Sequence, residues 1–178
     1  MPMDVTKLRP EMKKKLAELL KNCRAKGIEM RASDGLRTPL EQARLWRQSR
    51  SSEQISAKIK ELQDAGAVYL AGVLSAIGRQ SGPDVTGAIP GYSWHQWGEA
   101  VDCFWLVDGK AEWSLTRKVG GLNGYVVYAN EAEKLGLTAG GHWPRRKDWP
   151  HVQLRSANGP GDAMTLLQID AEMQKRFG

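Results

Sequence analysis

The fold is decided by Ser93-Trp94-His95-Gln96-Trp97-Gly98-Glu99-Ala100-Val101-Asp102, which leads into Cys103-Phe104-Trp105-Leu106-Val107. Residues 100–107 form a short, almost continuous apolar run, and such a run predicts a β-strand inside the protein. Both faces of this strand look apolar, apart from Asp102. Asp108-Gly109 follows directly and is a hairpin turn signal.

Asp102 is the residue of this strand that needs an explanation. Its neighbours on the same face are Ala100 and Phe104, and an isolated carboxylate buried there would cost several kcal/mol or more. It therefore needs a cation, either an arginine or a metal ion. His95 lies seven residues earlier, and His151 begins a second predicted strand. Two imidazoles and one carboxylate, with a fourth position open to water, are the ligand set of a catalytic zinc site.

The number of histidines alone does not establish a shared metal site. The chain has three, and all fall within residues 95–151, which favours one shared site over three separate core or surface roles. A HExxH helix, the commonest signature of zinc peptidases, is absent. A fourth protein ligand would close the water position, so we expect His142 to lie behind the ligands or to face the substrate.

Helices dominate the first half of the chain and strands cluster in the second, which predicts an α+β domain. A capping box, Thr38-Pro39-Leu40-Glu41, places Arg37 at the mouth of a helix. The other predicted helices cover residues 10–26, two segments within 52–80 broken near Gly66, 125–135 and 162–176, and the predicted strands cover 28–32, 100–107 and 151–154. Residues 81–93 and the segment opening at Gly140-Gly141 are predicted loops.

Length and composition predict one soluble domain over residues 1–178, with 41% hydrophobic and 26% charged residues. No apolar run follows the basic residues 13–15, and no stretch approaches membrane-spanning length. We therefore expect synthesis in the cytoplasm without a signal peptide and no stable membrane insertion. Cys23 and Cys103 lie outside any CxxC pair and are predicted to be buried free thiols.

The net charge of +6 favours a polyanionic partner, either nucleic acid or the bacterial cell envelope. Lysine and arginine are spread along the chain, with small clusters only at residues 13–15 and 145–147. No nucleic-acid-binding motif is present, so nucleic acid is not the expected partner.

The two histidine-bearing segments resemble a family of zinc peptidases, which includes VanY-type D-alanyl-D-alanine carboxypeptidases and phage L-alanyl-D-glutamate endopeptidases. The family pattern is Ser-x-His-x-x-Gly-x-Ala-x-Asp, followed by Asp/Glu-x-x-His after a stretch rich in Gly and Trp. The matching positions are Ser93, His95, Gly98, Ala100, Asp102, Asp148 and His151. The resemblance covers about residues 30–154. It implies a hedgehog/DD-peptidase-like fold, with a small antiparallel sheet that carries the zinc site and packs against several helices.

The resemblance also implies the roles of individual residues. The zinc ligands would be His95, Asp102 and His151, the general base and acid would be Asp148, and Arg37 would stabilise the oxyanion. The residues expected to contact the substrate are Ser93, Gln42, His142 and Trp143.

Two of these assignments have alternatives in which the residue has no catalytic role. Asp148 would otherwise be a surface aspartate beside residues 145–147, and Arg37 a salt-bridge partner at a helix mouth. The chain departs from the family at His142-Trp143, where relatives often read Asp-Trp, and at Leu36, where they have an aromatic residue.

The function implied is a zinc-dependent cut in the stem peptides of peptidoglycan. We expect an L-alanyl-D-glutamate endopeptidase that acts as a monomeric phage endolysin and reaches the wall after holin-type release. The alternatives are a D-Ala-D-Ala carboxypeptidase or dipeptidase, and a wall-binding module that keeps zinc without catalysis. The exact bond is not determined by the sequence.

Overall fold

The computed structural model describes residues 3–178. The chain forms two compact units, each built from segments that are distant in sequence. Met1–Leu36 and Trp97–Ser156 make the first, which we call the sheet unit, and Arg37–Gln96 and Ala157–Gly178 make the second, the helical unit. The single domain predicted over residues 1–178 stays a prediction.

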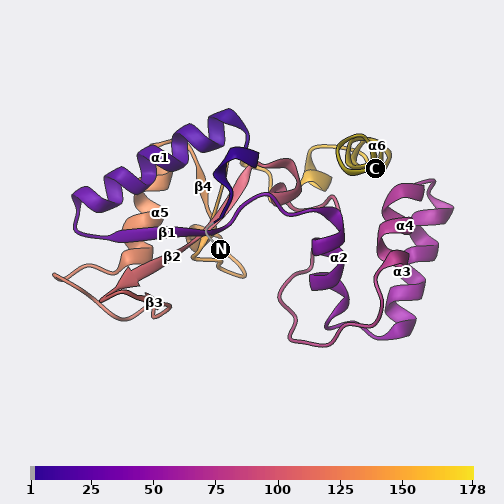
Figure 1. Cartoon of the computed structure of the whole chain (residues 1–178), viewed down its shortest axis with the longest axis horizontal. Coiled ribbons are helices and arrows are strands. Elements are labelled where there is room, and N and C mark those ends of the chain that lie inside the picture. The colour runs from indigo at the N-terminus through magenta and orange to yellow at the C-terminus, as the bar shows by residue number, and fades with distance from the viewer. Residues whose placement is uncertain (1–2) are drawn as a thin grey trace. The chain divides into compact units, whose positions relative to one another are not determined.

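The sheet is small and antiparallel, as predicted, and β2 is its central strand (Figure 1). Its strands are β1 (Glu29–Asp34), β2 (Ala100–Val107), β3 (Lys110–Glu112), β4 (Thr138–Ala139) and β5 (His151–Gln153). The order is β1-β2-β5-β4, and β3 pairs with β2 through the Asp108-Gly109 hairpin. The observed β2 has the predicted limits, whereas β4 was not predicted.

One face of β2 is covered by two helices, α1 (Pro10–Ala25) and α5 (Gly124–Lys134). Val101, Cys103 and Trp105 on this face are buried in the core with residues of both helices. Gly124 begins α5 where a Cβ atom would lie 2.4 Å from the Trp105 ring, so only glycine permits this packing.

The opposite face of β2 is less buried than its sequence suggests. Asp102 and Phe104 are only partly buried, whereas the core-facing residues next to them are fully buried. The strand therefore has one core face and one partly accessible face, and Asp102 lies on the accessible one.

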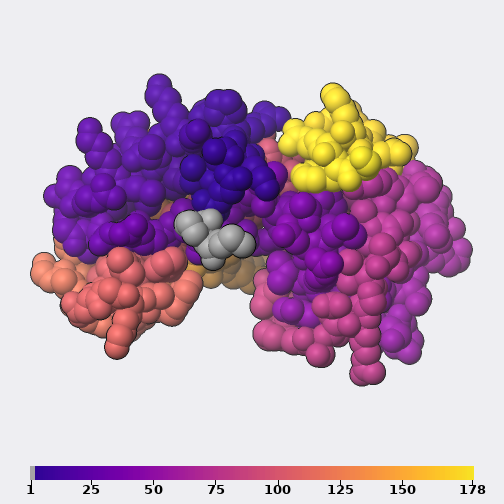
Figure 2. Space-filling model, viewed as in Figure 1, coloured from indigo at the N-terminus to yellow at the C-terminus, as the bar shows by residue number. Residues whose placement is uncertain are grey.

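The helical unit contains α2 (Pro39–Arg47), α3 (Ser52–Asp64), α4 (Val68–Ala76) and α6 (Leu166–Phe177). The other three helices pack against α4, and Figure 2 shows the yellow C-terminal segment resting on magenta residues of the same unit. The Asp170 carboxylate accepts a hydrogen bond of 2.8 Å from the Leu70 backbone, which joins α6 to α4. The predicted capping box at Thr38 is confirmed.

The last helix begins later than predicted. Residues Pro160–Asp162 form a separate 3-10 turn, η4, and Thr165 caps α6 in a capping box with Gln168. Further 3-10 turns in the described residues are η1 (Val5–Lys7), η2 (Trp94–Trp97) and η3 (Gly140–His142). Among residues 3–178, no helix has the length and apolarity to cross a membrane. Cys23 and Cys103 are buried free thiols, as predicted.

Candidate metal centre

Asp102 and His151 are brought together by the register of the sheet. They are directly opposite each other on β2 and β5, and opposite residues of an antiparallel pair share a face. His151 Nδ1 lies 3.0 Å from Asp102 Oδ1. The sheet thus positions an imidazole and a carboxylate that are 49 residues apart in the sequence.

The second nitrogen of His151 is held by Gln153. His151 Nε2 lies 2.9 Å from Gln153 Oε1, and Gln153 Nε2 donates to the Arg155 carbonyl at 2.7 Å. Because the amide nitrogen of Gln153 acts as a donor, its oxygen is the acceptor, and His151 Nε2 must carry a hydrogen. In a neutral ring, Nδ1 then presents a lone pair to Asp102.

A lone pair and a carboxylate oxygen at 3.0 Å repel each other unless a cation lies between them. Burial disfavours the charged imidazole, but the hydrogen bond and charge of Asp102, together with Gln153 and Asp148, hold the pKa of His151 above its ordinary value. The surroundings therefore attract positive charge, which either a proton or a metal ion can supply.

His95 completes the cluster. One donor atom each from His95, Asp102 and His151 lies within 4.8 Å of the others. Both histidines are buried, and Asp102 is partly exposed. Gly98, with φ of +68°, makes the turn between η2 and β2 that only glycine adopts readily. Two imidazole nitrogens and one carboxylate oxygen, with Gln153 behind one imidazole, fit a zinc ion.

Asp148 lies at the turn that enters β5. Its backbone N–H donates to the Gly140 carbonyl at 3.0 Å, and its own carbonyl accepts from the His151 N–H at 3.1 Å. The charge of Asp148 contributes to the raised pKa of His151. A Cβ atom on Gly140 would lie 2.3 Å from the Asp148 carbonyl oxygen, and this close approach requires glycine.

A pocket of about 200 Å³ adjoins Asp148. Its walls include Trp113, Leu115 and Trp149, and the Lys147 ammonium lies 5.5 Å from the centre of the Trp149 ring. Trp113 and Leu115 are more than half exposed. Neither was singled out from the sequence, where a tryptophan and a leucine after a hairpin look like ordinary packing residues.

His142 and Trp143 have different surroundings. His142 Nδ1 lies 2.7 Å from Glu133 Oε1 on α5, and His142 is not part of the cluster of donor atoms. The Trp143 ring lies 5.2 Å from the His151 ring. In the described part of the chain, the buried Trp143 Nε1–H has no hydrogen-bond partner. Such an orphaned donor beside the cluster is suited to a substrate oxygen.

The helical unit holds the other predicted site residues. Arg37 Nη1 donates to Gln42 Oε1 at 2.9 Å, and Gln96 Nε2 donates to the same oxygen at 3.1 Å. Gln42 is fully buried, and its amide nitrogen donates to the Ala88 carbonyl at 2.7 Å. The structure therefore gives Gln42 a positioning contact on Arg37, while its contact with substrate stays a prediction. Ser93 Oγ accepts from the His95 backbone N–H at 3.4 Å.

Solved structures similar to this chain include two of low sequence identity. The L-Ala D-Glu endopeptidase ChiX of Serratia marcescens is 20% identical, with a TM-score of 0.45 over 85% of this chain and 83% of that chain. The second is a mutant of the vancomycin resistance D,D-pentapeptidase VanY from a VanB-type cassette, in complex with Zn(II). It is 17% identical, with a TM-score of 0.46 over 96% of this chain and 84% of that chain. No curated protein sequence matches the chain.

A family profile gives the clearer result. The profile of VanY, described as D-alanyl-D-alanine carboxypeptidase, matches residues 5–139. The matched stretch contains His95 and Asp102 and ends before Asp148 and His151. It spans more than half of the sequence, and this protein therefore belongs to the VanY family of D-alanyl-D-alanine carboxypeptidases.

Proposed function

We propose that this protein is a zinc-dependent peptidase that hydrolyses the L-alanyl-D-glutamate bond in peptidoglycan stem peptides. The observation that carries the proposal is the cluster of His95, Asp102 and His151 donor atoms within 4.8 Å, with Asp148 beside it. In this proposal the three residues hold one zinc ion. Zinc bound there would act as a Lewis acid toward the amide carbonyl and would lower the pKa of a water molecule to about 7.

Asp148 is the proposed general base and acid. It would take a proton from the attacking water and return it to the leaving amine. Two features support this role: Asp148 is exposed, and hydrogen bonds to Gly140 and His151 fix its backbone. A non-catalytic metal site has no need of such a carboxylate, which argues against an inactive wall-binding module.

The pocket beside Asp148 is the proposed site for the leaving residue. Both candidate bonds place an α-carboxylate one carbon from the leaving nitrogen, because D-Glu is linked onward through its side chain and a terminal D-Ala is free. Lys147 supplies a positive charge for that carboxylate. The exposed Trp113 and Leu115 offer apolar walls to a chain that continues past the cleaved bond, which supports the endopeptidase over a carboxypeptidase.

Arg37 is proposed to stabilise the oxyanion, with its guanidinium oriented by Gln42. Ser93 and Trp143 are proposed to bind substrate oxygens, and His142 to lie at the edge of the site. The net charge of +6 would draw the protein to the anionic envelope. We propose a lytic role at the cell wall, as a phage endolysin that acts as a monomer after holin-type release.

The family match favours a second candidate, a D-alanyl-D-alanine carboxypeptidase. A digest of purified peptidoglycan by the zinc-loaded protein separates the two, with chelator-treated protein as the control and mass spectrometry as the readout. New N-terminal D-Glu is the expected product, and only without chelator. Free D-Ala or D-Ala-D-Ala would replace the endopeptidase by the carboxypeptidase. No product from several wall types, with zinc bound, would contradict both.

A further inference from the structure

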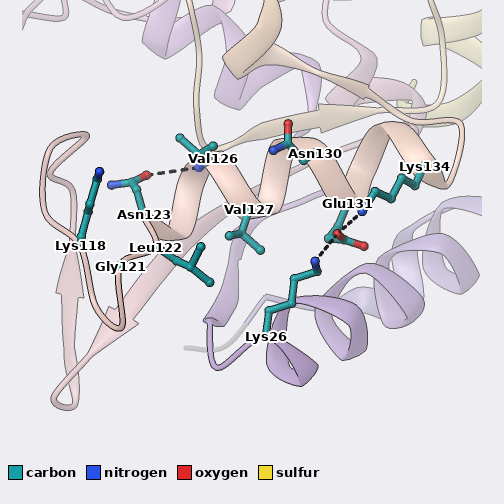
Figure 3. Close-up of a pocket in the computed structure, with 10 residues that line it drawn as sticks. All are labelled: Lys26, Lys118, Gly121, Leu122, Asn123, Val126, Val127, Asn130, Glu131 and Lys134. Atoms are coloured by element: carbon teal, nitrogen blue, oxygen red, sulfur yellow. Dashed lines mark hydrogen bonds and ion pairs between the residues drawn. The ribbon is translucent and has the colours of Figure 1, made fainter.

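A larger pocket of about 570 Å³ follows the outer face of α5 in the sheet unit (Figure 3). The α5 residues that line it, with the cap residue Asn123, are spaced as one face of a helix: 123, 126, 127, 130, 131 and 134. At 1.5 Å per residue, this face extends for about 16 Å. The pocket is therefore a groove, and its other walls are formed by Lys26, Lys118, Gly121 and Leu122.

The groove is separate from the candidate metal centre. Helix α5 packs against the face of β2 that carries Val101, Cys103 and Trp105. Asp102 and its partner His151 are on the opposite face of the sheet. No residue proposed for catalysis or metal binding lines the groove.

One end of the groove is apolar. Leu122 and Val126 are 41% and 42% exposed, and Val127 lies between the groove and the core. An apolar side chain that covered Leu122 and Val126 would remove apolar surface from water, which favours binding. This end is suited to small apolar groups.

The other end holds two ammonium groups close together. The Nζ atoms of Lys26 and Lys134 lie 3.3 and 2.7 Å from the same oxygen, Glu131 Oε1, as Figure 3 shows. Glu131 is buried, so it fixes both lysines without facing the solvent itself. A carboxylate from a ligand could bind the remaining N–H groups of both lysines.

Lys118 adds a positive charge at the Asn123 end of α5. Within residues 3–178 it makes no ion pair. With three lysines and one glutamate, the lining has a net charge of +2 (3 − 1). The Lys26–Lys134 pair thus lies at one end of the groove, and Lys118 stands with the apolar residues Leu122 and Val126 at the other.

We propose that this groove binds a short acidic peptide in extended form, with its carboxylates near Lys118 and the Lys26–Lys134 pair. An extended peptide rises about 3.3 Å per residue, so five residues match the groove length of about 16 Å. Peptidoglycan stem peptides have this chemistry, since they combine alanine methyl groups with several carboxylates. The choice of stem peptide as the natural occupant rests on the proposed function. Binding here would hold the enzyme on the wall between cuts.

The test uses the full chain with Asp148→Ala, so that the peptide is not consumed, and a synthetic stem pentapeptide as the probe. NMR shifts of the α5 amides report the groove separately from the metal centre, and we expect Val127, Asn130 and Glu131 to respond. Val126→Glu places a carboxylate in the groove at the first turn of α5, which has no acidic residue. An acid at a helix N-terminus favours the helix, so this variant should fold while binding weakens at least about tenfold.

Leu167→Glu is the matched control. Leu167 is an exposed aliphatic residue in the first turn of α6, which also has no acidic residue. This variant should bind the peptide as the parent does. Lys118→Glu is a second groove variant that breaks no ion pair, and it should weaken binding as well.

Three results would overturn the proposal: silent α5 amides, equal loss of binding in the control, or a response to anionic phospholipid vesicles but not to the peptide. If the protein cleaves stem peptides while the NMR shifts of the α5 amides do not change, only the proposed peptide binding in the groove is contradicted. If the NMR shifts of the α5 amides change but the protein does not hydrolyse peptidoglycan, only the proposed function is contradicted.

Discussion

At the scale of single residues, Gln153 determines which ring nitrogen of His151 carries the hydrogen. Its amide is oriented by the Arg155 carbonyl, and its oxygen then fixes the hydrogen on His151 Nε2. Nδ1 is left to face Asp102. Outer partners of this kind hold a histidine in the tautomer that a metal ion requires. The sequence pattern identifies the histidine, but the choice of nitrogen depends on its neighbours in space.

Asp148 supplies the sharpest test at this scale. Asp148→Ala should reduce hydrolysis of stem peptides by at least about 100-fold, because it removes the proposed proton carrier. Zinc content should not change, since Asp148 is not one of the clustered donors. Steady-state rates and metal analysis of the same preparation check both points.

The control for Asp148→Ala is Asp108→Ala, which changes an exposed aspartate in the β2–β3 turn. It should leave the rate unchanged. Activity of Asp148→Ala equal to that of the parent would remove Asp148 from the mechanism, and loss of zinc would move it to the metal site.

At the scale of elements, the short turn η3 supports the site. The Gly140 carbonyl accepts from the Asp148 N–H at 3.0 Å, and the glycine lies against both Asp148 and His151. A turn of three residues can press this closely on β5 only because its first residue has no side chain.

Gly140→Ala tests this packing. The new Cβ atom would lie 2.3 Å from the Asp148 carbonyl oxygen and 3.1 Å from His151 Cβ, so the backbone must move. We expect a loss of about 1–3 kcal/mol in the free energy of unfolding, together with lower activity. Urea unfolding curves and hydrolysis rates measure the two effects.

Gly72→Ala is the matched control for that substitution. Gly72 lies within α4, and a Cβ atom there would meet nothing within 4 Å. This variant should be more stable by about 0.5–1 kcal/mol, because alanine loses less backbone freedom than glycine in a helix. If both variants behave alike, the close approach at Gly140 is not what requires glycine.

At the scale of the whole chain, a buried carboxylate joins three distant segments of the sheet unit. Glu99, 1% exposed, directly precedes β2 and pairs with Arg9 at 3.1 Å and with Arg155. The hydrogen bond and the charge of Glu99 raise the pKa of Arg155 above its ordinary value. The N-terminal segment and the segment after β5 are thereby held to the start of the central strand.

Replacing both arginines should show how much their pairing with Glu99 contributes to the free energy of unfolding. The double variant Arg9→Ala with Arg155→Ala leaves a buried charge without a partner, which costs about 3–5 kcal/mol of stability in buried pairs. The two arginines are about half exposed, so we expect the lower end of that range. Each single variant should cost less than half of the double, because Glu99 keeps one partner.

Arg31→Ala serves as the control for that cycle. It breaks an exposed pair with Glu29 and should change the free energy of unfolding by less than about 1 kcal/mol. Strict additivity of the Arg9 and Arg155 variants would mean that the two arginines act independently. Denaturant unfolding of the parent, the two single variants, the double variant and the control decides between these outcomes.

Much of this protein can be derived from the sequence, because the relevant information is local. Capping boxes, the glycine terminators of helices and the apolar run of β2 placed most helices and the central strand within a few residues. The spacing of His95, Asp102 and His151 also predicted three residues that the structure brings together. A strand of two residues, such as β4, has too little periodicity to be recognised.

Only the tertiary structure decided how distant segments meet. The pairing of Asp102 with His151, the contact of Gln42 with Gln96, and the two pockets of the sheet unit each depend on residues far apart in the chain. Local patterns report which face of an element is apolar, but the register between strands and the approach of a turn are set by packing. The three candidate metal-binding residues were therefore readable from the sequence, and their arrangement was not.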